Sequence, residues 1–166
     1  LDLHASYELV CEFKTPAVVI VKHNNPCGAA TSNMLKKAFT QAHACDPLSA
    51  FGGIVALNQP VDEASAVSIY KSGFLECIIA PRFSQGARKV FKDKKNLRLL
   101  ELENLGSNKY RDIKRVSGGI LLQDKDCLSV IEDSLTVVTK KKPTKKQMES
   151  LLFGWIVAKH VKSNAI

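Results

Sequence analysis

The chain has 166 residues, of which 45% are hydrophobic and 24% charged, a composition typical of one globular domain. Its formal net charge of +8 indicates an anionic partner. No apolar run approaches the roughly 18 residues of a membrane span, and no signal core opens the chain, so we expect a soluble, cytoplasmic protein without a membrane partner.

The cysteines are five in number, widely spaced and free of any C-x-x-C pair: Cys11, Cys27, Cys45, Cys77 and Cys127. An odd count with this spacing argues against a disulfide framework and favours reduced thiols. A structural zinc site has little support, because the paired cysteines that such sites use are missing.

The first part of the chain reads as a helix followed by a strand. Residues 3–13 have helical spacing, and Pro16 prevents the helix from continuing. Residues 17–21 form a continuous apolar, largely β-branched run, which is typical of a strand buried on both faces of a parallel sheet. The polar residues 23–28 are predicted to form a loop.

Helices and strands then alternate. Further helices are predicted over residues 34–45, 62–72 and 84–93, and further strands over 54–57, 77–80 and 97–100. Ser32 or Asn33 is available to cap the first of these helices and Asp62 the second, with Gly73 at a position that favours a left-handed residue. This alternation predicts an α/β fold with a mainly parallel sheet flanked by helices.

The pattern weakens after residue 101. Residues 102–112 are polar and predicted to form a loop, and short strands are predicted at Val116, 120–122 and 135–138. Thr144 and Gln147 have the spacing of a capping box that opens a helix over about 145–161. The chain begins almost inside a helix and stops directly after one, so we expect both ends to be cut.

The segment 22–28, KHNNPCG, follows the first buried strand. In open α/β sheets the ligand crevice lies at the carboxyl ends of the strands, which makes this segment a candidate site. Lys22 supplies a cation, His23 an imidazole that can act as a base, and the asparagines supply amides. A polar loop in which His23 only bonds to backbone remains an open alternative.

Two other chemistries deserve comparison with this segment. Zinc deaminases use H-x-E together with P-C-x-x-C, but here Asn25 stands in place of the glutamate and Cys27 lacks a second cysteine. A Cys27 nucleophile activated by His23 is possible in principle, although neighbours in a turn usually point apart.

The segment 46–53, DPLSAFGG, is a second candidate. Gly52 and Gly53 would let the backbone approach a ligand, and Leu48 and Phe51 would offer apolar surface to a flat ring. The alternative is a Gly-Gly turn with Phe51 in the core.

Several segments taken together resemble the AICAR transformylase family of bacterial bifunctional purine-biosynthesis enzymes (AICAR is 5-aminoimidazole-4-carboxamide ribonucleotide). The matching segments occur in the family's order: VIVKHNNPCG at 19–28, DPLSAFGGI at 46–54, IIAP at 78–81, KNLRLL at 95–100 and KHVKSNAI at 159–166. The resemblance covers essentially the whole chain.

The resemblance implies a cytidine-deaminase-like α/β fold. Residues 1–166 would be the first part of the transformylase domain, a single α/β unit truncated at both ends, with the IMP cyclohydrolase domain absent. The implied activity is transfer of a formyl group from 10-formyltetrahydrofolate, a co-substrate, to the 5-amino group of AICAR, without a catalytic metal. Family members are homodimers with composite sites, so the isolated chain is expected to be inactive.

The resemblance also assigns roles to individual residues. His23 would be the base and Lys22 the cation that stabilises negative charge on the formyl oxygen or protonates the departing folate nitrogen. The binding residues that it implies are Asn24, Gly52, Glu76 and Asn164 for AICAR, and Leu48 and Phe51 for the folate. Glu76 can also be read as a strand-edge carboxylate, and Asn164 as a helix-end residue.

A nucleic-acid-binding module is the main rival from another functional class. It is motivated by the basic clusters at 88–95 and 140–146. Aromatic residues make up only 7% of the chain and do not alternate with these clusters as stacking platforms would. No nucleic-acid partner is therefore expected.

Overall fold

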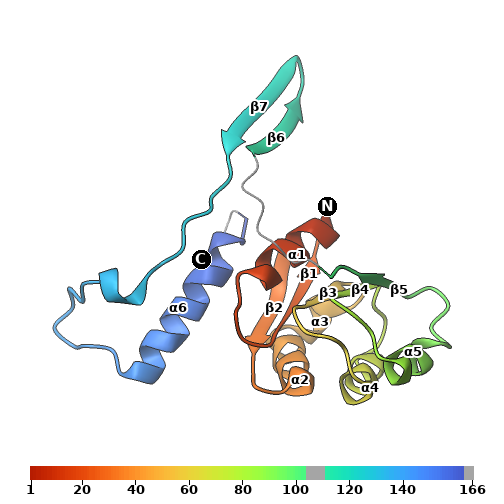
Figure 1. Cartoon of the computed structure of the whole chain (residues 1–166). Coiled ribbons are helices and arrows are strands. Elements are labelled where there is room, and N and C mark those ends of the chain that lie inside the picture. Colours follow the sequence, from red (N-terminus) through yellow and green to blue (C-terminus); the bar gives the residue numbers. More distant parts are fainter. Residues whose placement is uncertain (104–110, 163–166) are drawn as a thin grey trace. The chain divides into compact units, whose positions relative to one another are not determined.

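The computed structural model of the chain describes residues 1–103 and 111–162 (Figure 1). The chain divides into two compact units. The first comprises Leu1–Leu105 with Ile156–Ile166, and the second comprises Gly106–Trp155. Among the described helices, none combines the length and the apolar character needed to cross a membrane.

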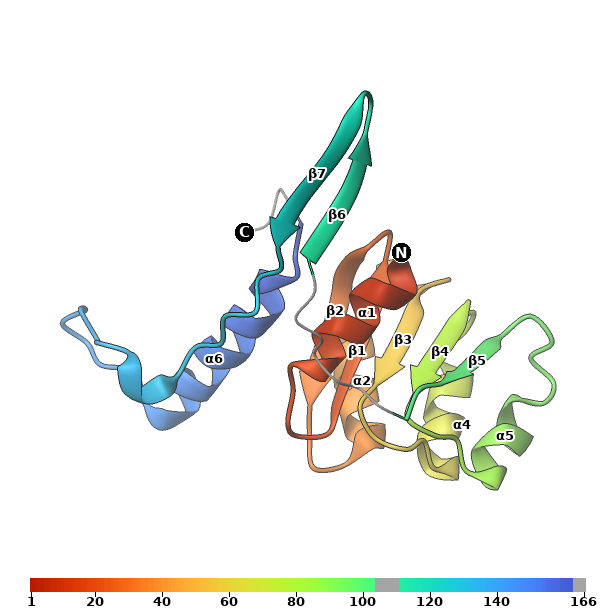
Figure 2. The ribbon, with the colours of Figure 1, turned by 45° about the horizontal axis from the view of Figure 1, so that its top comes forward.

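The first unit is built on a five-stranded sheet with the order β2-β1-β3-β4-β5. Its strands are β1 (Ala17–Lys22), β2 (Asn25–Thr31), β3 (Ile54–Leu57), β4 (Cys77–Ala80) and β5 (Arg98–Glu101). Its helices are α1 (Asp2–Cys11), α2 (Leu35–Cys45), α3 (Pro47–Ala50), α4 (Glu63–Lys71) and α5 (Gln85–Phe91). Figure 2 shows α1 over one face of the sheet and α2, α4 and α5 on the other. The layered α/β fold expected from the sequence is confirmed.

Strand β1 is buried on both faces because helices cover both faces of the sheet. Val18 and Ile20 join the core cluster under α2, α4 and α5, while Val19 and Val21 are buried on the opposite side of the strand. The strands β3, β4 and β5 are parallel, but β1 runs antiparallel to both of its neighbours. The parallel pairing expected for this strand is wrong. A continuous apolar run indicates that both faces of a strand are buried, but it does not indicate the direction of the strand.

The loop expected at 23–28 is also wrong. Only His23 and Asn24 form the turn, with φ of 52° and 64°, and β2 begins at Asn25. Two successive residues with positive φ are the geometry of a type I′ hairpin turn. Pro26 is tolerated in β2 because this is an edge strand, and because the β1–β2 register shifts between Ile20 and Val21.

The helices follow their predicted spans, and most of their caps do too. Asp62 accepts the backbone N–H of Ser65 at 2.8 Å at the start of α4. Neither Ser32 nor Asn33 caps α2, whose N-cap is Met34 without a side-chain hydrogen bond.

The short helix α3 has no counterpart among the predicted elements. Asp46 caps it by accepting the Ser49 N–H at 2.9 Å, and Pro47 stands at its first position. The residues that end α2 therefore also begin α3.

The second unit contains the hairpin of β6 (Arg111–Val116) and β7 (Gly119–Asp124), the short 3-10 helix η1 (Glu132–Ser134) and most of α6 (Lys145–Lys159). The capping box is confirmed, since the backbone N–H of Thr144 donates to Gln147 Oε1 at 2.9 Å and that of Gln147 donates to Thr144 Oγ1 at 3.3 Å. Residues 135–138 form no strand, and 111–112, expected in a loop, open β6. Residues 104–110 of that predicted loop lie outside the described part.

Candidate functional site

The candidate residues gather at one end of the five-stranded sheet. The register aligns Val21 with Ile54, Ile54 with Cys77, and Cys77 with Arg98, so these four residues form one row across β1, β3, β4 and β5. Because β1 is antiparallel to β3, its carboxyl end meets the amino ends of β3, β4 and β5. The site therefore does not lie where the carboxyl ends of parallel strands meet, which corrects the geometric argument made from the sequence.

Lys22 is fixed at the edge of this row by a hydrogen bond. Its half-buried side chain donates from Nζ to the carbonyl oxygen of Gly52 at 2.9 Å. Gly52 has φ of +66°, and a Cβ atom built on it would lie 2.9 Å from Lys22 Nζ. The positive φ favours glycine here, and an added methyl group would also have to displace the Lys22 amine. The structure thus joins the two segments that the sequence singled out separately.

His23 and Asn24 project from the end of the β1–β2 hairpin. His23 is exposed, so its imidazole is accessible to a ligand. The backbone N–H of Asn24 donates to Asp2 Oδ1 at 3.0 Å, which ties the turn to the start of α1. Asn24 Oδ1 is buried and has no hydrogen-bond partner among the described residues, so a ligand N–H or a water molecule could satisfy it.

An apolar platform lies next to Lys22. Leu48 is exposed, and Phe51 is 66% exposed, which excludes the alternative that Phe51 belongs to the core. The ring of Phe51 lies 5.5 Å from that of Phe74, centroid to centroid, and the Gly52 N–H donates to the Phe74 carbonyl at 2.8 Å. Sequence reasoning missed Phe74; an apolar residue directly after Gly73, outside the helix, was the available signal.

A pocket of about 310 Å³ lies beside Phe74. Its lining includes Tyr70, Leu75, Lys94 and Lys95. Lys94 Nζ lies 4.6 Å from the centroid of the Tyr70 ring and donates to the carbonyl of Gly73 at 3.2 Å. Phe74 also lines this pocket, so the aromatic platform borders a pocket whose charged lining residues are Asp93, Lys94 and Lys95.

Glu76 reaches the same end of the sheet through β4. Its backbone N–H donates to the Gly53 carbonyl at 3.1 Å, and its carboxylate pairs with Arg98 at 3.0 Å. The described contacts of Glu76 agree with the strand-edge reading, and its role as a ligand contact stays a prediction. Asn164, the remaining candidate, lies outside the described residues.

Cys27 is a poor nucleophile in this setting. Burial, reinforced by the nearby Asp46 carboxylate, raises the pKa of its thiol, which favours the neutral form. Its Sγ lies 3.5 Å from the carbonyl of Ile20. Within residues 1–103 and 111–162, no group of three or more histidine, cysteine, aspartate or glutamate side chains is placed to hold a metal ion.

Known proteins provide an independent comparison. The family model described as AICARFT/IMPCHase bienzyme matches residues 1–166. The bifunctional purine biosynthesis protein PurH of Thermoanaerobacter sp. (strain X514) is 52% identical over 165 residues, which is 99% of this chain and 32% of that protein. The PurH protein of Anaeromyxobacter sp. (strain K) is 49% identical over 175 residues, covering 100% of this chain and 33% of the relative.

The chain thus spans about a third of the length of these relatives. Among solved structures, RibD of Acinetobacter baumannii is similar with a TM-score of 0.49 and 12% sequence identity. That match covers 63% of this chain and 37% of the RibD chain.

Proposed function

This chain belongs to the AICARFT/IMPCHase bienzyme family, and from that premise we propose that it supplies one side of a formyl-transfer site in a purine-biosynthesis enzyme. The reaction would move the formyl group of 10-formyltetrahydrofolate to the 5-amino group of AICAR. The observation that carries this proposal is the arrangement of Lys22, fixed against Gly52, beside the exposed His23 at the end of β1.

His23 is proposed as the general base. The 5-amino nitrogen of AICAR is a weak nucleophile because its lone pair is delocalised, so it must lose a proton as it attacks the formyl carbon. A new C–N bond forms to AICAR, the bond from the formyl carbon to folate N10 breaks, and N10 receives a proton. An exposed imidazole on a tight two-residue turn suits the removal of the amine proton.

Lys22 is proposed to stabilise the negative charge that develops on the formyl oxygen. Such a preorganised donor is worth about 3 kcal/mol in other enzymes. Its bond to Gly52 fixes the amine before substrate arrives and still leaves two of its three N–H groups for a ligand. Protonation of folate N10 is the other role that this amine could perform.

The platform of Leu48, Phe51 and Phe74 is proposed to contact the folate. A folate combines flat rings with a carboxylate-bearing tail. The apolar surface could contact the rings, and Lys94 and Lys95 of the neighbouring pocket could contact the tail. The proposed AICAR contacts are Asn24, Gly52, Glu76 and Asn164. The proposal needs no catalytic metal, and it places the longer protein in the cytoplasm as a homodimer.

A nucleic-acid-binding role has less support. In the segment 82–98 the arginines pair with glutamates: Arg82 with Glu103, Arg88 with Glu101, and Arg98 with Glu76. This pairing reduces the charge available to a phosphate backbone, so we propose no nucleic-acid partner.

The proposal is tested with a chimera in which this chain replaces the matching part of the Thermoanaerobacter relative. The chimera should release tetrahydrofolate only when both 10-formyltetrahydrofolate and AICAR are present. A folded chimera without formyl transfer, beside an unmodified relative that performs it, would contradict the proposed function.

A further inference from the structure

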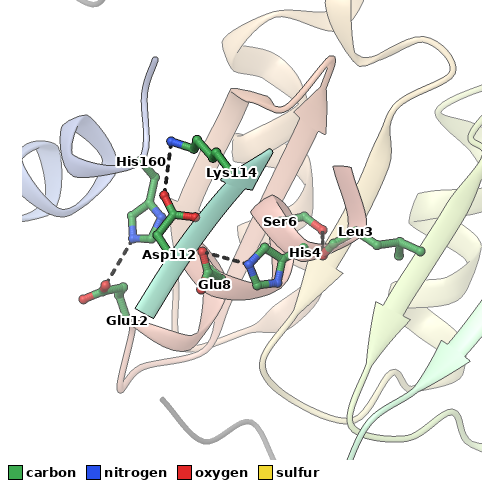
Figure 3. A network of polar contacts seen from close by, with 8 residues as sticks. All are labelled: Leu3, His4, Ser6, Glu8, Glu12, Asp112, Lys114 and His160. Atoms are coloured by element: carbon green, nitrogen blue, oxygen red, sulfur yellow. Dashed lines mark hydrogen bonds and ion pairs between the residues drawn. The ribbon is translucent and has the colours of Figure 1, made fainter. Parts of the chain in front are cut away.

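One carboxylate joins the end of α1 to the end of α6 within the first unit. Glu12 Oε1 lies 2.7 Å from Lys159 Nζ and 3.1 Å from His160 Nε2. Figure 3 shows the imidazole of His160 directed at the Glu12 carboxylate. We call Glu12, Lys159 and His160 the Glu12 latch.

The latch is largely shielded from solvent. The exposed fractions of the side chains are 25% for Glu12, 11% for Lys159 and 13% for His160. Shielded charges lose hydration, and this cost offsets part of the attraction between them. A single oxygen shared by two basic side chains fixes how the end of α6 lies on α1.

Two further hydrogen bonds connect this assembly to the β1–β2 turn. The backbone N–H of Lys162, two residues beyond the latch, donates to Asn25 Oδ1 at 2.8 Å. At the other end of α1, Asp2 accepts the backbone N–H of Asn24 at 3.0 Å. The turn that carries His23 is therefore held from both sides, by the start of α1 and by the chain that follows α6.

We propose that Glu12 is a positioning residue for AICAR binding. It holds residues 160–162 against Asn25, and so fixes the turn on which the proposed AICAR contact Asn24 lies. This inference rests on the proposed function. The proposed folate contacts Leu48 and Phe51 lie in the segment 46–53, which takes no part in the hydrogen bonds that hold the β1–β2 turn.

The variant Glu12→Gln removes the charge that binds Lys159 while keeping the size of the side chain. Glu8→Gln is the matched control, because Glu8 lies one turn earlier on α1 and pairs with a histidine, His4, at 3.4 Å (Figure 3). The double variant Glu12→Gln, Lys159→Gln removes both charges of the ion pair, so a result shared by the two variants does not depend on the remaining Lys159 charge.

Amide hydrogen exchange on this chain tests the latch without any reaction. Glu12→Gln and the double variant should speed exchange of the Lys162 amide by about tenfold or more, because the Lys162–Asn25 bond opens more often. Glu8→Gln should leave that rate unchanged. Equal exchange of the Lys162 amide in all variants would show that the Glu12 latch does not stabilise the Lys162–Asn25 hydrogen bond, and would overturn the proposal.

Kinetics in the chimera test the positioning role. Both latch variants should raise the KM for AICAR by about fivefold or more, while the KM for 10-formyltetrahydrofolate and the Tm stay close to those of Glu8→Gln. An unchanged KM for AICAR, or equal increases in both KM values, would overturn it. Absence of transfer in the unmodified chimera would contradict both the proposed function and the positioning role. The hydrogen-exchange experiment would still show whether the Glu12 latch holds Lys162 against Asn25.

Discussion

At the scale of single residues, Gly52 has the most demanding position in the candidate site. Its left-handed backbone costs a residue with a side chain about 1–2 kcal/mol, and an added methyl group would also crowd the Lys22 amine at 2.9 Å. Gly52→Ala should therefore lower the free energy of unfolding by at least that amount and reduce formyl transfer in the chimera. Denaturant unfolding and steady-state kinetics measure the two effects.

Gly118→Ala provides the control for this substitution. Gly118 also has positive φ, of +79°, but nothing lies within 4 Å of the Cβ that would be added. It should show the conformational cost alone, with formyl transfer unchanged. Equal losses of transfer in both variants would show that crowding of Lys22 is unimportant.

Asp46 gives the site a pH-dependent component. Hydrogen bonds from Ser49 hold the pKa of this carboxyl below its ordinary value of 3.8. A folded-state pKa that is depressed adds stability above the unfolded-state value, and this stability is lost as the pH falls through the folded-state pKa. The decrease in Tm between pH 6 and pH 3 should be smaller in Asp46→Asn, which keeps an oxygen to cap α3 but cannot titrate.

At the scale of elements, Gly28 sets how closely α2 packs on β2. A Cβ on Gly28 would lie 2.1 Å from the backbone carbonyl oxygen of Ala42, so the helix would have to move. Gly28→Ala should lower the free energy of unfolding by about 3 kcal/mol. Gly154→Ala is the control, because this helical glycine has nothing within 4 Å and the change should raise helix stability by about 0.5–1 kcal/mol. Chemical denaturation that leaves Gly28→Ala unaffected would contradict the packing described.

The helices and strands themselves were largely predictable, since hydrophobic periodicity and capping residues such as Asp62 depend on the local sequence. The direction of β1 was not predictable, because antiparallel pairing with β3 depends on where the chain returns and not on the composition of the strand. The tight turn was missed because both of its residues, His23 and Asn24, adopt positive φ although neither is a glycine. Residues 135–138 have strand-like composition but pair with none of the strands in the described part of the chain.

At the scale of the whole molecule, the two units differ in how much surface they bury. The first unit has a continuous core, whereas none of residues 111–132 and 134–155 is buried. The second unit carries an apolar groove of about 740 Å³ that includes Leu151, Leu152 and Trp155. Exposed apolar surface of this extent favours association.

The isolated chain should therefore fold through its first unit, self-associate, and fail to transfer formyl groups. Transition-state stabilisation needs several groups held together, and the chain spans only about a third of its relatives. Light scattering and a formyl-transfer assay on one preparation measure both properties. Monomers, or turnover comparable to that of the chimera, would contradict this expectation.

The sequence led to both segments of the candidate site but not to the contacts that join them. Lys22, His23 and Phe51 stand in recognisable segments, and their roles stay predictions. The neighbours Phe74 and Arg98 and the latch residue Glu12 were missed, because their contacts link positions that are far apart in the chain. Such contacts follow from the packing of the sheet and helices.

The measurement that tests the central claim most directly compares the chimera with its His23→Asn variant. Asparagine tolerates the positive φ of this turn but cannot accept the amine proton, so the fold is kept while the base is lost. The kcat for formyl transfer should fall by about 100 to 10,000-fold, with the Kd for AICAR within about tenfold. His43→Gln, which removes a histidine from α2, should leave kcat unchanged. Turnover of His23→Asn equal to that of the unmodified chimera would contradict the account.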